Sequence, residues 1–274
     1  MERPASTCSS CRRRRNSFGR KGGAVEDQEL SDRVLREDVD GISFLTLNRP
    51  EKLNALDSAI FLRLAEHVEA LEVAEDVHCV VIAGAGRSFS AGNDLTDIGK
   101  PTKSERLHVR GELVERLANL PQPVVAKIRG HCFTGGLEVA LAADLLIGDQ
   151  SARFADTHGT WGLTPLWGMS QRLPRRVGLA NAKRMMFTSR TLSAEEALSI
   201  GLIDLCVAPE RLDEEVRLLA GSIVANSSFS NRAYKRLLRE TDGMPLGEGL
   251  RYEREKTPGI APDALERIRG FKKR

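Results

Sequence analysis

Two glycine-containing turns carry the groups that could do chemistry in this sequence. They span residues 84–94 and 130–138, and each follows a short run of apolar, β-branched residues. Glycine after a buried strand lets backbone N–H groups face a ligand without an intervening side chain. Two such turns side by side would form an oxyanion hole, a pair of donors for negative charge developing on a carbonyl oxygen. Glu138, in the first turn of the helix expected next, would project beside this hole as a general acid or base.

The same turns also have a simpler interpretation. Glycine is ordinary where a strand passes into a helix, and the helix dipole stabilises a glutamate near a helix N-terminus. Other chemistries lack their motifs, because the chain has no GxGxxG that opens a helix, no GxxxxGK[ST] loop and no GxSxG elbow. Acid–base chemistry beside an oxyanion hole, or a purely structural role, are therefore the alternatives for these turns.

Strand-like and helical patterns alternate around the turns. Apolar, β-branched runs predict strands at 41–47, 79–83, 123–128 and 145–147. Apolar spacing predicts helices near 58–71, with Asp57 or Ser58 as its cap, and at 137–143. Beyond about residue 178 only helices are expected, at 194–200 after a Ser193–Glu196 capping box, and at 212–224, 231–238 and 262–271. The pattern indicates an α/β fold followed by a helical tail.

The net charge is unevenly distributed along the chain. The 274 residues include 41 Lys and Arg against 38 Asp and Glu, which gives +3. Residues 1–23 hold seven cations and one anion, so they carry +6 and the remaining body carries −3. This segment has few large apolar residues to offset the entropy of ordering, so we expect a disordered basic tail. The acidic body argues against a nucleic-acid partner.

Cysteine usage and hydropathy limit the expected location. Five cysteines, with a single CxxC at Cys8 and Cys11, form neither a disulfide framework nor a metal site. No run of about 18 apolar residues exists, so no membrane span is expected. We expect a cytoplasmic protein, or one of the mitochondrial matrix if the basic tail is a transit peptide.

Taken together, the motifs resemble those of the enoyl-CoA hydratase/isomerase (crotonase) superfamily. The similarity is colinear from about residue 34 to 274, and residues 1–23 lie outside it. It is carried by LNRPEKLNAL at 47–56, FSAGNDL at 89–95, PVVA at 123–126 with GGLEVALAAD at 135–144, TLSA at 191–194 with GLI at 201–203, and FKKR at 271–274.

The resemblance implies a fold and a substrate class. The fold would be a crotonase-like spiral of ββα units at 24–208, followed by an α-helical trimerisation region at 209–274. It implies a homotrimer or a dimer of trimers, and an acyl-CoA thioester as substrate. Coenzyme A would then be part of the substrate, with no separate cofactor and no metal.

The resemblance also assigns roles to individual residues. The backbone N–H groups of Asn93 and Gly135 would form the oxyanion hole for an enolate. Leu53 and Ala55 match the stretch that meets the adenine of CoA. Lys52 and Lys272 could bind its phosphates, because an ammonium and a phosphate oxygen make a charge-assisted hydrogen bond. The remaining substrate-binding residues that it implies are Asp94, Leu95 and Gly136.

One position departs from the hydratase pattern. Hydratases of this family use two glutamates, and the position of the second is occupied here by His158. An imidazole can exchange a proton near neutrality, so His158 would replace that glutamate, or it would shape the site without a proton role. Asp156 would share a strand face with His158, although a turn or surface position is the simpler expectation. Trp161 and Trp167 would wall an acyl pocket or simply pack in the core.

The sequence therefore favours an enoyl-CoA hydratase-type lyase with Glu138 and His158 as catalytic residues. The alternative is an enoyl-CoA double-bond isomerase, which needs only one acid–base carboxylate. An acyl-CoA decarboxylase, a thioesterase or a non-catalytic acyl-CoA binder of the same fold also remain open.

Overall fold

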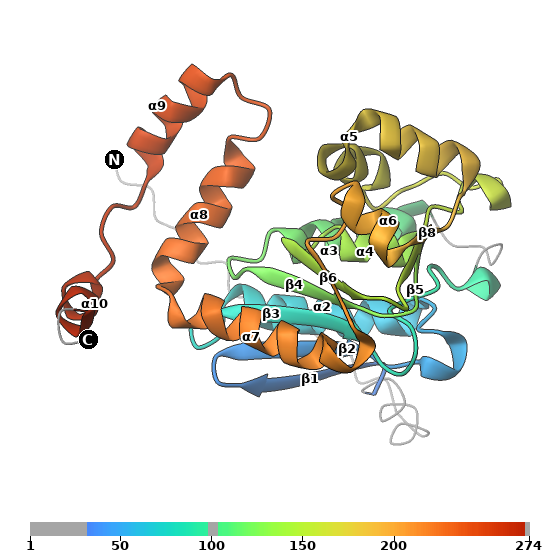
Figure 1. The fold of residues 1–274 in the computed structure, drawn as a ribbon, viewed down its shortest axis with the longest axis horizontal. Coiled ribbons are helices and arrows are strands. Elements are labelled where there is room, and N and C mark those ends of the chain that lie inside the picture. Colours follow the sequence, from blue (N-terminus) through green and yellow to red (C-terminus); the bar gives the residue numbers. More distant parts are fainter. Residues whose placement is uncertain (1–31, 98–103, 272–274) are drawn as a thin grey trace, which may run out of the picture.

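A six-stranded sheet forms the centre of the protein (Figure 1). The computed structural model describes residues 32–97 and 104–271, so the predicted tail at 1–23 and Lys272 lie outside it. The first two strands of the chain, at one edge of the sheet, pair antiparallel, and all other neighbouring strands of this sheet are parallel. In spatial order the strands are β1 (Val34–Val39), β2 (Ile42–Leu47), β3 (Cys79–Gly84), β4 (Val124–Ile128), β6 (Leu145–Asp149) and β9 (Leu205–Val207).

A smaller three-stranded sheet lies beside the first. It contains β5 (His131–Phe133), β7 (Arg153–Ala155) and β8 (Leu192–Ser193). The expectation of helices alone beyond residue 178 is wrong, because β8 pairs with β7 and β9 pairs with β6. Strands of two or three residues are too short for an apolar period to reveal, so only pairing with distant strands defines them.

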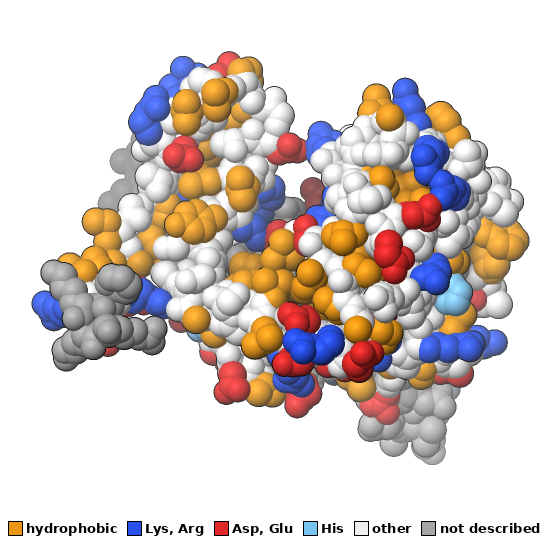
Figure 2. Space-filling model, in the orientation of Figure 1, with side chains coloured by type: hydrophobic (Ala, Val, Ile, Leu, Met, Phe, Trp, Pro, Cys, Tyr) orange, Lys and Arg blue, Asp and Glu red, His pale blue; other side chains and the backbone are white. Residues whose placement is uncertain are grey.

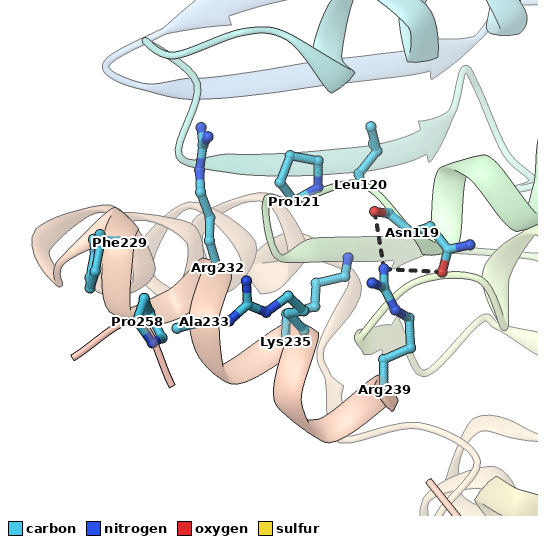
Figure 3. A pocket seen from close by; sticks show the side chains of 10 residues that line it. Asn119, Leu120, Pro121, Phe229, Arg232, Ala233, Lys235, Arg239 and Pro258 are labelled. Atoms are coloured by element: carbon cyan, nitrogen blue, oxygen red, sulfur yellow. Dashed lines mark hydrogen bonds between the residues drawn. The ribbon is translucent and has the colours of Figure 1, made fainter. Parts of the chain in front are cut away.

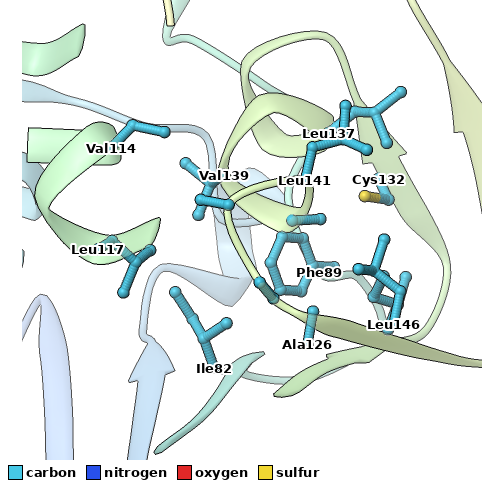
Figure 4. Close-up of a cluster of buried hydrophobic side chains, with 14 of the residues drawn as sticks. Ile82, Phe89, Val114, Leu117, Ala126, Cys132, Leu137, Val139, Leu141 and Leu146 are labelled. Carbon is cyan, nitrogen blue, oxygen red and sulfur yellow. The ribbon is translucent and has the colours of Figure 1, made fainter. Parts of the chain in front are cut away.

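Helices cover one face of the large sheet and enclose the main core. They are α2 (Ser58–Glu72), α3 (Ser104–Ala118), α4 (Gly135–Ala140), α5 (Met169–Thr188) and α6 (Ala194–Ser199). The predicted cap of α2 is confirmed, since the Asp57 carboxylate accepts a hydrogen bond from the Ile60 N–H at 2.8 Å. Phe89, in the loop after β3, is fully buried between Ile82 and Leu137 of this core (Figure 4). The loop that follows β3 is thereby anchored in the interior.

The opposite face of the sheet is covered by α7 (Leu212–Ala225). Its Leu212, Val216 and Ala220 are buried against side chains of β3 and β4 in a second apolar cluster. Burial of both faces explains why β3 and β4 read as continuous apolar runs. The C-terminal region expected at 209–274 thus begins with a helix that packs on the central sheet.

The last three helices extend away from this body as an arm, α8 (Ser228–Glu240), α9 (Leu246–Lys256) and α10 (Ala264–Phe271) (Figure 1). Arg232, Lys235 and Arg239 of α8 reach back to the body (Figure 3). Their cations bond to backbone carbonyls, to the Asn119 side-chain oxygen and to the Asp144 carboxylate. The space-filling view shows hydrophobic side chains on the surface of the arm (Figure 2). Among the exposed ones are Leu238, at 75%, and Leu246, at 78%.

Candidate active site

A cavity of about 440 Å³ lies where the two predicted turns meet the segment that precedes α5. Glu138 and His158 both line it, together with the backbone segments at Asn93 and Gly135. Apolar and aromatic side chains form most of the remaining wall, namely Leu95, Phe133, Trp161, Leu163, Leu166 and Trp167. An apolar hollow with a few convergent polar groups is the usual form of a small-molecule site.

The two oxyanion segments are brought together by backbone pairing. The Ser90 N–H donates to the His131 carbonyl at 2.8 Å, and the Phe133 N–H donates to the Ser90 carbonyl at 3.0 Å. A Cβ placed on Gly92 would lie only 3.4 Å from the Gly135 nitrogen. In the described ranges the N–H groups of Asn93 and Gly135 are not used in any internal hydrogen bond. They are therefore available to a carbonyl oxygen in the cavity.

The segment predicted to bind CoA supports this arrangement from behind. The Ala91 N–H donates to the Leu53 carbonyl at 2.9 Å, and the Ser90 hydroxyl donates to the Asn54 carbonyl at 2.8 Å. Leu53 and Asn54 both adopt positive φ, near 52° and 54°, in a tight turn. Lys52, Leu53 and Ala55 thus lie beside the oxyanion segment without lining the cavity. Their predicted contacts with CoA stay a prediction.

Backbone strain is located next to the Gly135 amide. Thr134 has φ near 50° and ψ near −113°, a conformation that a β-branched residue adopts only at a cost. Its hydroxyl shares a 2.5 Å hydrogen bond with the hydroxyl of Thr157 and accepts the Thr157 N–H at 3.1 Å. These bonds hold the peptide that presents Gly135 and join it to the segment carrying His158.

Glu138 occupies the first turn of α4 with 1% of its surface exposed. Its Oε1 accepts hydrogen bonds from the backbone N–H groups of Trp167 at 2.9 Å and Met169 at 3.0 Å. Its Oε2 faces the His158 Nε2 at 3.8 Å. Burial raises the pKa of Glu138, even though these N–H groups and His158 act in the opposite direction. The carboxyl therefore favours its protonated form more than an exposed glutamate does.

His158 faces Glu138 and is held by Asp156. The His158 Nδ1 lies 2.6 Å from the Asp156 Oδ1, and the same oxygen accepts the His158 backbone N–H at 3.1 Å. The expectation of a surface position for Asp156 is wrong, because its side chain is only 2% exposed, whereas the expectation of a turn is confirmed by its bond to the backbone N–H two residues ahead. β7 ends at Ala155, so Asp156 and His158 meet through a local turn and not through a shared strand face.

Asp94, a predicted substrate-binding residue, has a different environment. It is not among the residues that line the cavity, and its carboxylate forms a short ion pair with the Arg49 guanidinium. The Thr96 N–H and hydroxyl donate to its other oxygen at 2.9 and 2.8 Å. Burial alone would raise the pKa of Asp94, but the bonds from Arg49 and Thr96 outweigh burial and lower it to about 2.

Replacing Asp94 with asparagine should cost stability in a pH-dependent way. The folded pKa lies below the ordinary value of 3.8, so the contribution of Asp94 is fully present above about pH 4 and is lost as the pH falls towards 2. Urea unfolding should show Asp94→Asn less stable by about 1–2 kcal/mol at pH 7, with the difference shrinking below pH 4. Exposed Asp76→Asn is the matched control. A difference that does not vary with pH would exclude the ion pair as its source.

The other predicted residues divide between the cavity and the packing around it. Leu95 and Trp161 line the cavity and are more than half exposed. Trp167 lines it as well, but it is 5% exposed and packs edge-on against Phe61 with the ring centroids 4.8 Å apart. Gly136 does not line the cavity. It packs against Ser90 so closely that a Cβ on Gly136 would lie 2.7 Å from the Ser90 side chain.

The sequence interpretation missed Arg110. This residue of α3 lines the cavity, and its guanidinium donates to the Asn93 side-chain oxygen at 3.1 Å and to the Ser58 hydroxyl at 2.8 Å. It also lies 4.8 Å from the centre of the Phe61 ring. No local motif predicts that Arg110 of α3 contacts both a helix and a loop that lie far away in the sequence. Helical spacing in α3 would have placed Arg110 on the inner face of the helix, but it would not have shown which residues Arg110 contacts.

In the ranges that the structure describes, no group of three or more His, Cys, Asp or Glu is arranged to hold a metal ion. No helix in the same ranges combines the length and the apolar character that a membrane span needs.

A second cavity, of about 320 Å³, lies between α8 and residues 119–121 (Figure 3). The Arg and Lys side chains around it form hydrogen bonds with other residues of the protein.

Comparison with known proteins identifies the class to which this fold and site belong. The sequence profile of the enoyl-CoA hydratase/isomerase family matches residues 37–257. The chain belongs to that family. It is 32% identical over 251 residues to the probable peroxisomal enoyl-CoA hydratase 1 of Arabidopsis thaliana, covering 89% of this chain and 95% of the relative.

Solved structures agree with this assignment. The enoyl-CoA hydratase of Bacillus anthracis superposes with a TM-score of 0.83 at 29% identity, over 88% of this chain and 96% of the other. An enoyl-CoA hydratase homologue from Thermobifida fusca, solved in complex with acetoacetyl-CoA, has a TM-score of 0.77 at 27% identity, over 83% of this chain and 94% of the other. The crotonase-like architecture predicted from the motifs is confirmed.

Proposed function

We propose that this protein is an enoyl-CoA hydratase that adds water reversibly across the 2,3 double bond of an enoyl-CoA thioester. The observation that carries the proposal is the convergence of the Glu138 carboxyl, the His158 imidazole and two unused backbone N–H groups on one cavity. Similar proteins are named enoyl-CoA hydratases, and one was solved with acetoacetyl-CoA, which supports a CoA thioester as substrate.

The proposed reaction assigns one role to each group. The protonated Glu138 carboxyl, favoured by burial, donates its proton to C2 of the substrate. The His158 Nε2 takes a proton from the water whose oxygen bonds to C3. The electrons of the double bond move to the thioester oxygen and form an enolate, which accepts hydrogen bonds from the N–H groups of Asn93 and Gly135. The same electron pair then forms the new C2–H bond. The His158 Nε2 and Glu138 Oε2 atoms lie 3.8 Å apart, beyond hydrogen-bond distance, so a bridging water then carries the proton from His158 to Glu138 and restores both groups.

A panel of enoyl-CoA esters of several chain lengths tests this function. Hydration removes the absorbance of the conjugated thioester and adds the mass of one water, so both are followed on purified protein. Loss of absorbance together with the mass gain supports hydration. Absence of both with every ester would reject it.

Double-bond isomerisation is the second candidate. In the part of the chain that the structure describes, Glu138 is the one carboxylate that lines the cavity, and isomerisation needs a single carboxylate to move a proton. The discriminating substrate is a 3-enoyl-CoA. A gain of conjugated absorbance at constant mass supports isomerisation, whereas hydration of 2-enoyl-CoA without that gain rejects it.

The proposal extends to assembly and context. The exposed hydrophobic side chains of the arm formed by α8, α9 and α10 support assembly into a homotrimer or a dimer of trimers. Light scattering on the purified 30.1 kDa chain tests this, since a monomeric mass would contradict it. The reaction requires no cofactor beyond the CoA of its substrate. Fatty acid metabolism, in the cytoplasm or the mitochondrial matrix, is the context that we propose.

A further inference from the structure

Three ionisable side chains form a buried line along one wall of the cavity. Asp156, His158 and Glu138 have side chains that are 2%, 11% and 1% exposed. The two nitrogens of the imidazole face opposite partners, with Nδ1 at 2.6 Å from the Asp156 Oδ1 and Nε2 at 3.8 Å from the Glu138 Oε2. The imidazole is therefore placed between two carboxyl groups, one of which lines the cavity and one of which does not.

The hydrogen bonds around Asp156 restrict which nitrogen of His158 carries the proton. An ionised carboxylate only accepts hydrogen bonds, so a 2.6 Å contact with Nδ1 requires a proton on Nδ1. In the neutral ring the other nitrogen is then an acceptor. The same Asp156 oxygen binds the His158 backbone N–H, so one carboxylate fixes both the main chain and the ring.

We infer that Asp156 is a positioning residue that holds His158 as its Nδ1–H tautomer and thereby makes Nε2 the proton acceptor that faces Glu138. This inference rests on the proposed hydration. When Nε2 takes a proton from water, the ring becomes a cation beside the Asp156 carboxylate, which stabilises it. Without Asp156 the ring is free to carry its proton on Nε2, and that nitrogen then accepts nothing.

A purely structural role for Asp156 predicts different behaviour. A carboxylate that accepts the N–H two residues ahead is a common turn device, and asparagine supplies the same accepting oxygen. Asp156→Asn therefore keeps the turn but removes the charge, and it leaves only a neutral amide oxygen, a weaker acceptor than a carboxylate, to hold the Nδ1–H of His158. A residue that only builds the turn would tolerate this change, whereas a residue that sets the tautomer of His158 would not.

A double-mutant cycle measures whether Asp156 acts through His158. Hydration rates are compared for the unaltered protein, Asp156→Asn, His158→Gln and the double variant. We expect Asp156→Asn to lower kcat about tenfold or more with little change in KM. In the His158→Gln background the same change should have an effect of about twofold at most. Equal losses in both backgrounds, or no loss in the first, would overturn the inference.

Nitrogen NMR of histidine-labelled protein provides a readout that needs no turnover. In the unaltered protein at pH 8, His158 should show a protonated Nδ1 and an unprotonated Nε2, with its signals assigned by their loss in His158→Gln. Asp156→Asn should shift this signal towards the Nε2–H tautomer, and Asp149→Asn, which changes another buried aspartate, should not. A protonated Nε2 in the unaltered protein would overturn the inference. Failure of the proposed hydration is a separate outcome, because it would appear as an absence of turnover with every enoyl-CoA ester, whereas the NMR signals do not depend on turnover.

Discussion

Glu138→Gln protein should fold normally and hydrate 2-enoyl-CoA thioesters about 10²–10⁴-fold more slowly than the unaltered chain. The glutamine oxygen can still accept the backbone N–H groups of Trp167 and Met169, so the α4 to α5 connection is preserved. What the amide lacks is an acidic proton to deliver to the substrate. Absorbance of the conjugated thioester measures the rate, and exposed Glu75→Gln is the matched control that should retain full activity.

The stability of the same variant has a predicted dependence on pH. Burial raises the pKa of Glu138, so the folded chain holds this proton more tightly than the unfolded chain does. The unaltered protein therefore loses stability as the pH rises above the ordinary value of 4.5, and the glutamine variant does not. Denaturant unfolding at a series of pH values should show the variant gaining relative to the unaltered protein. Activity that survives in a correctly folded Glu138→Gln would show that another group moves the proton.

Gly135→Ala should lower kcat about 10²–10³-fold, the loss usual for removal of one oxyanion donor. A Cβ on Gly135 would lie 2.4 Å from the Trp167 ring carbon Cζ3, closer than two carbon atoms can pack. The ring cannot easily move, because it is buried and packs edge-on against Phe61. Either the Gly135 amide or Trp167 must shift, and the Trp167 N–H is one of the two donors that hold Glu138.

Gly221 provides the matched control for this substitution. It lies within α7, and a Cβ there would meet no atom within 4 Å. Gly221→Ala should leave activity unchanged and raise the free energy of unfolding by up to about 1 kcal/mol, because alanine favours helix over glycine. Tryptophan fluorescence should change in Gly135→Ala and stay constant in Gly221→Ala. Full activity of a folded Gly135→Ala would exclude its amide from the oxyanion hole.

Local patterns in the sequence predicted the main elements well. The apolar runs at 79–83, 123–128 and 145–147 correspond to β3, β4 and β6, because burial on both faces leaves a continuous apolar stretch. The capping box at Ser193 and Glu196 is confirmed by reciprocal hydrogen bonds of 3.2 and 3.0 Å. Three helices, α3, α5 and α9, were not predicted. α5 contains Pro174 and a kink at Gly178, and α9 is dominated by charged residues with none of its side chains buried.

The candidate site was predictable only in part. Sequence placed Glu138 in the first turn of a helix, and the structure agrees, since α4 begins at Gly135. The donors that hold Glu138 come from residues 29 and 31 positions later, and no helical or strand period connects them. Arg110 likewise contacts Asn93 and Ser58, which lie 17 and 52 positions away.

The sequence by itself therefore predicted the family, the central strands β2, β3, β4 and β6 with α2 and α4 between them, and Glu138 and His158 as candidates beside an oxyanion segment. The tertiary structure alone decided that Asp156 is buried, that it binds His158 Nδ1 and that His158 Nε2 faces Glu138. The physical reason is that apolar periods and caps report contacts within about one helical turn or along one strand. The direction and protonation of a buried side chain depend on groups that only the folded chain brings within hydrogen-bond distance.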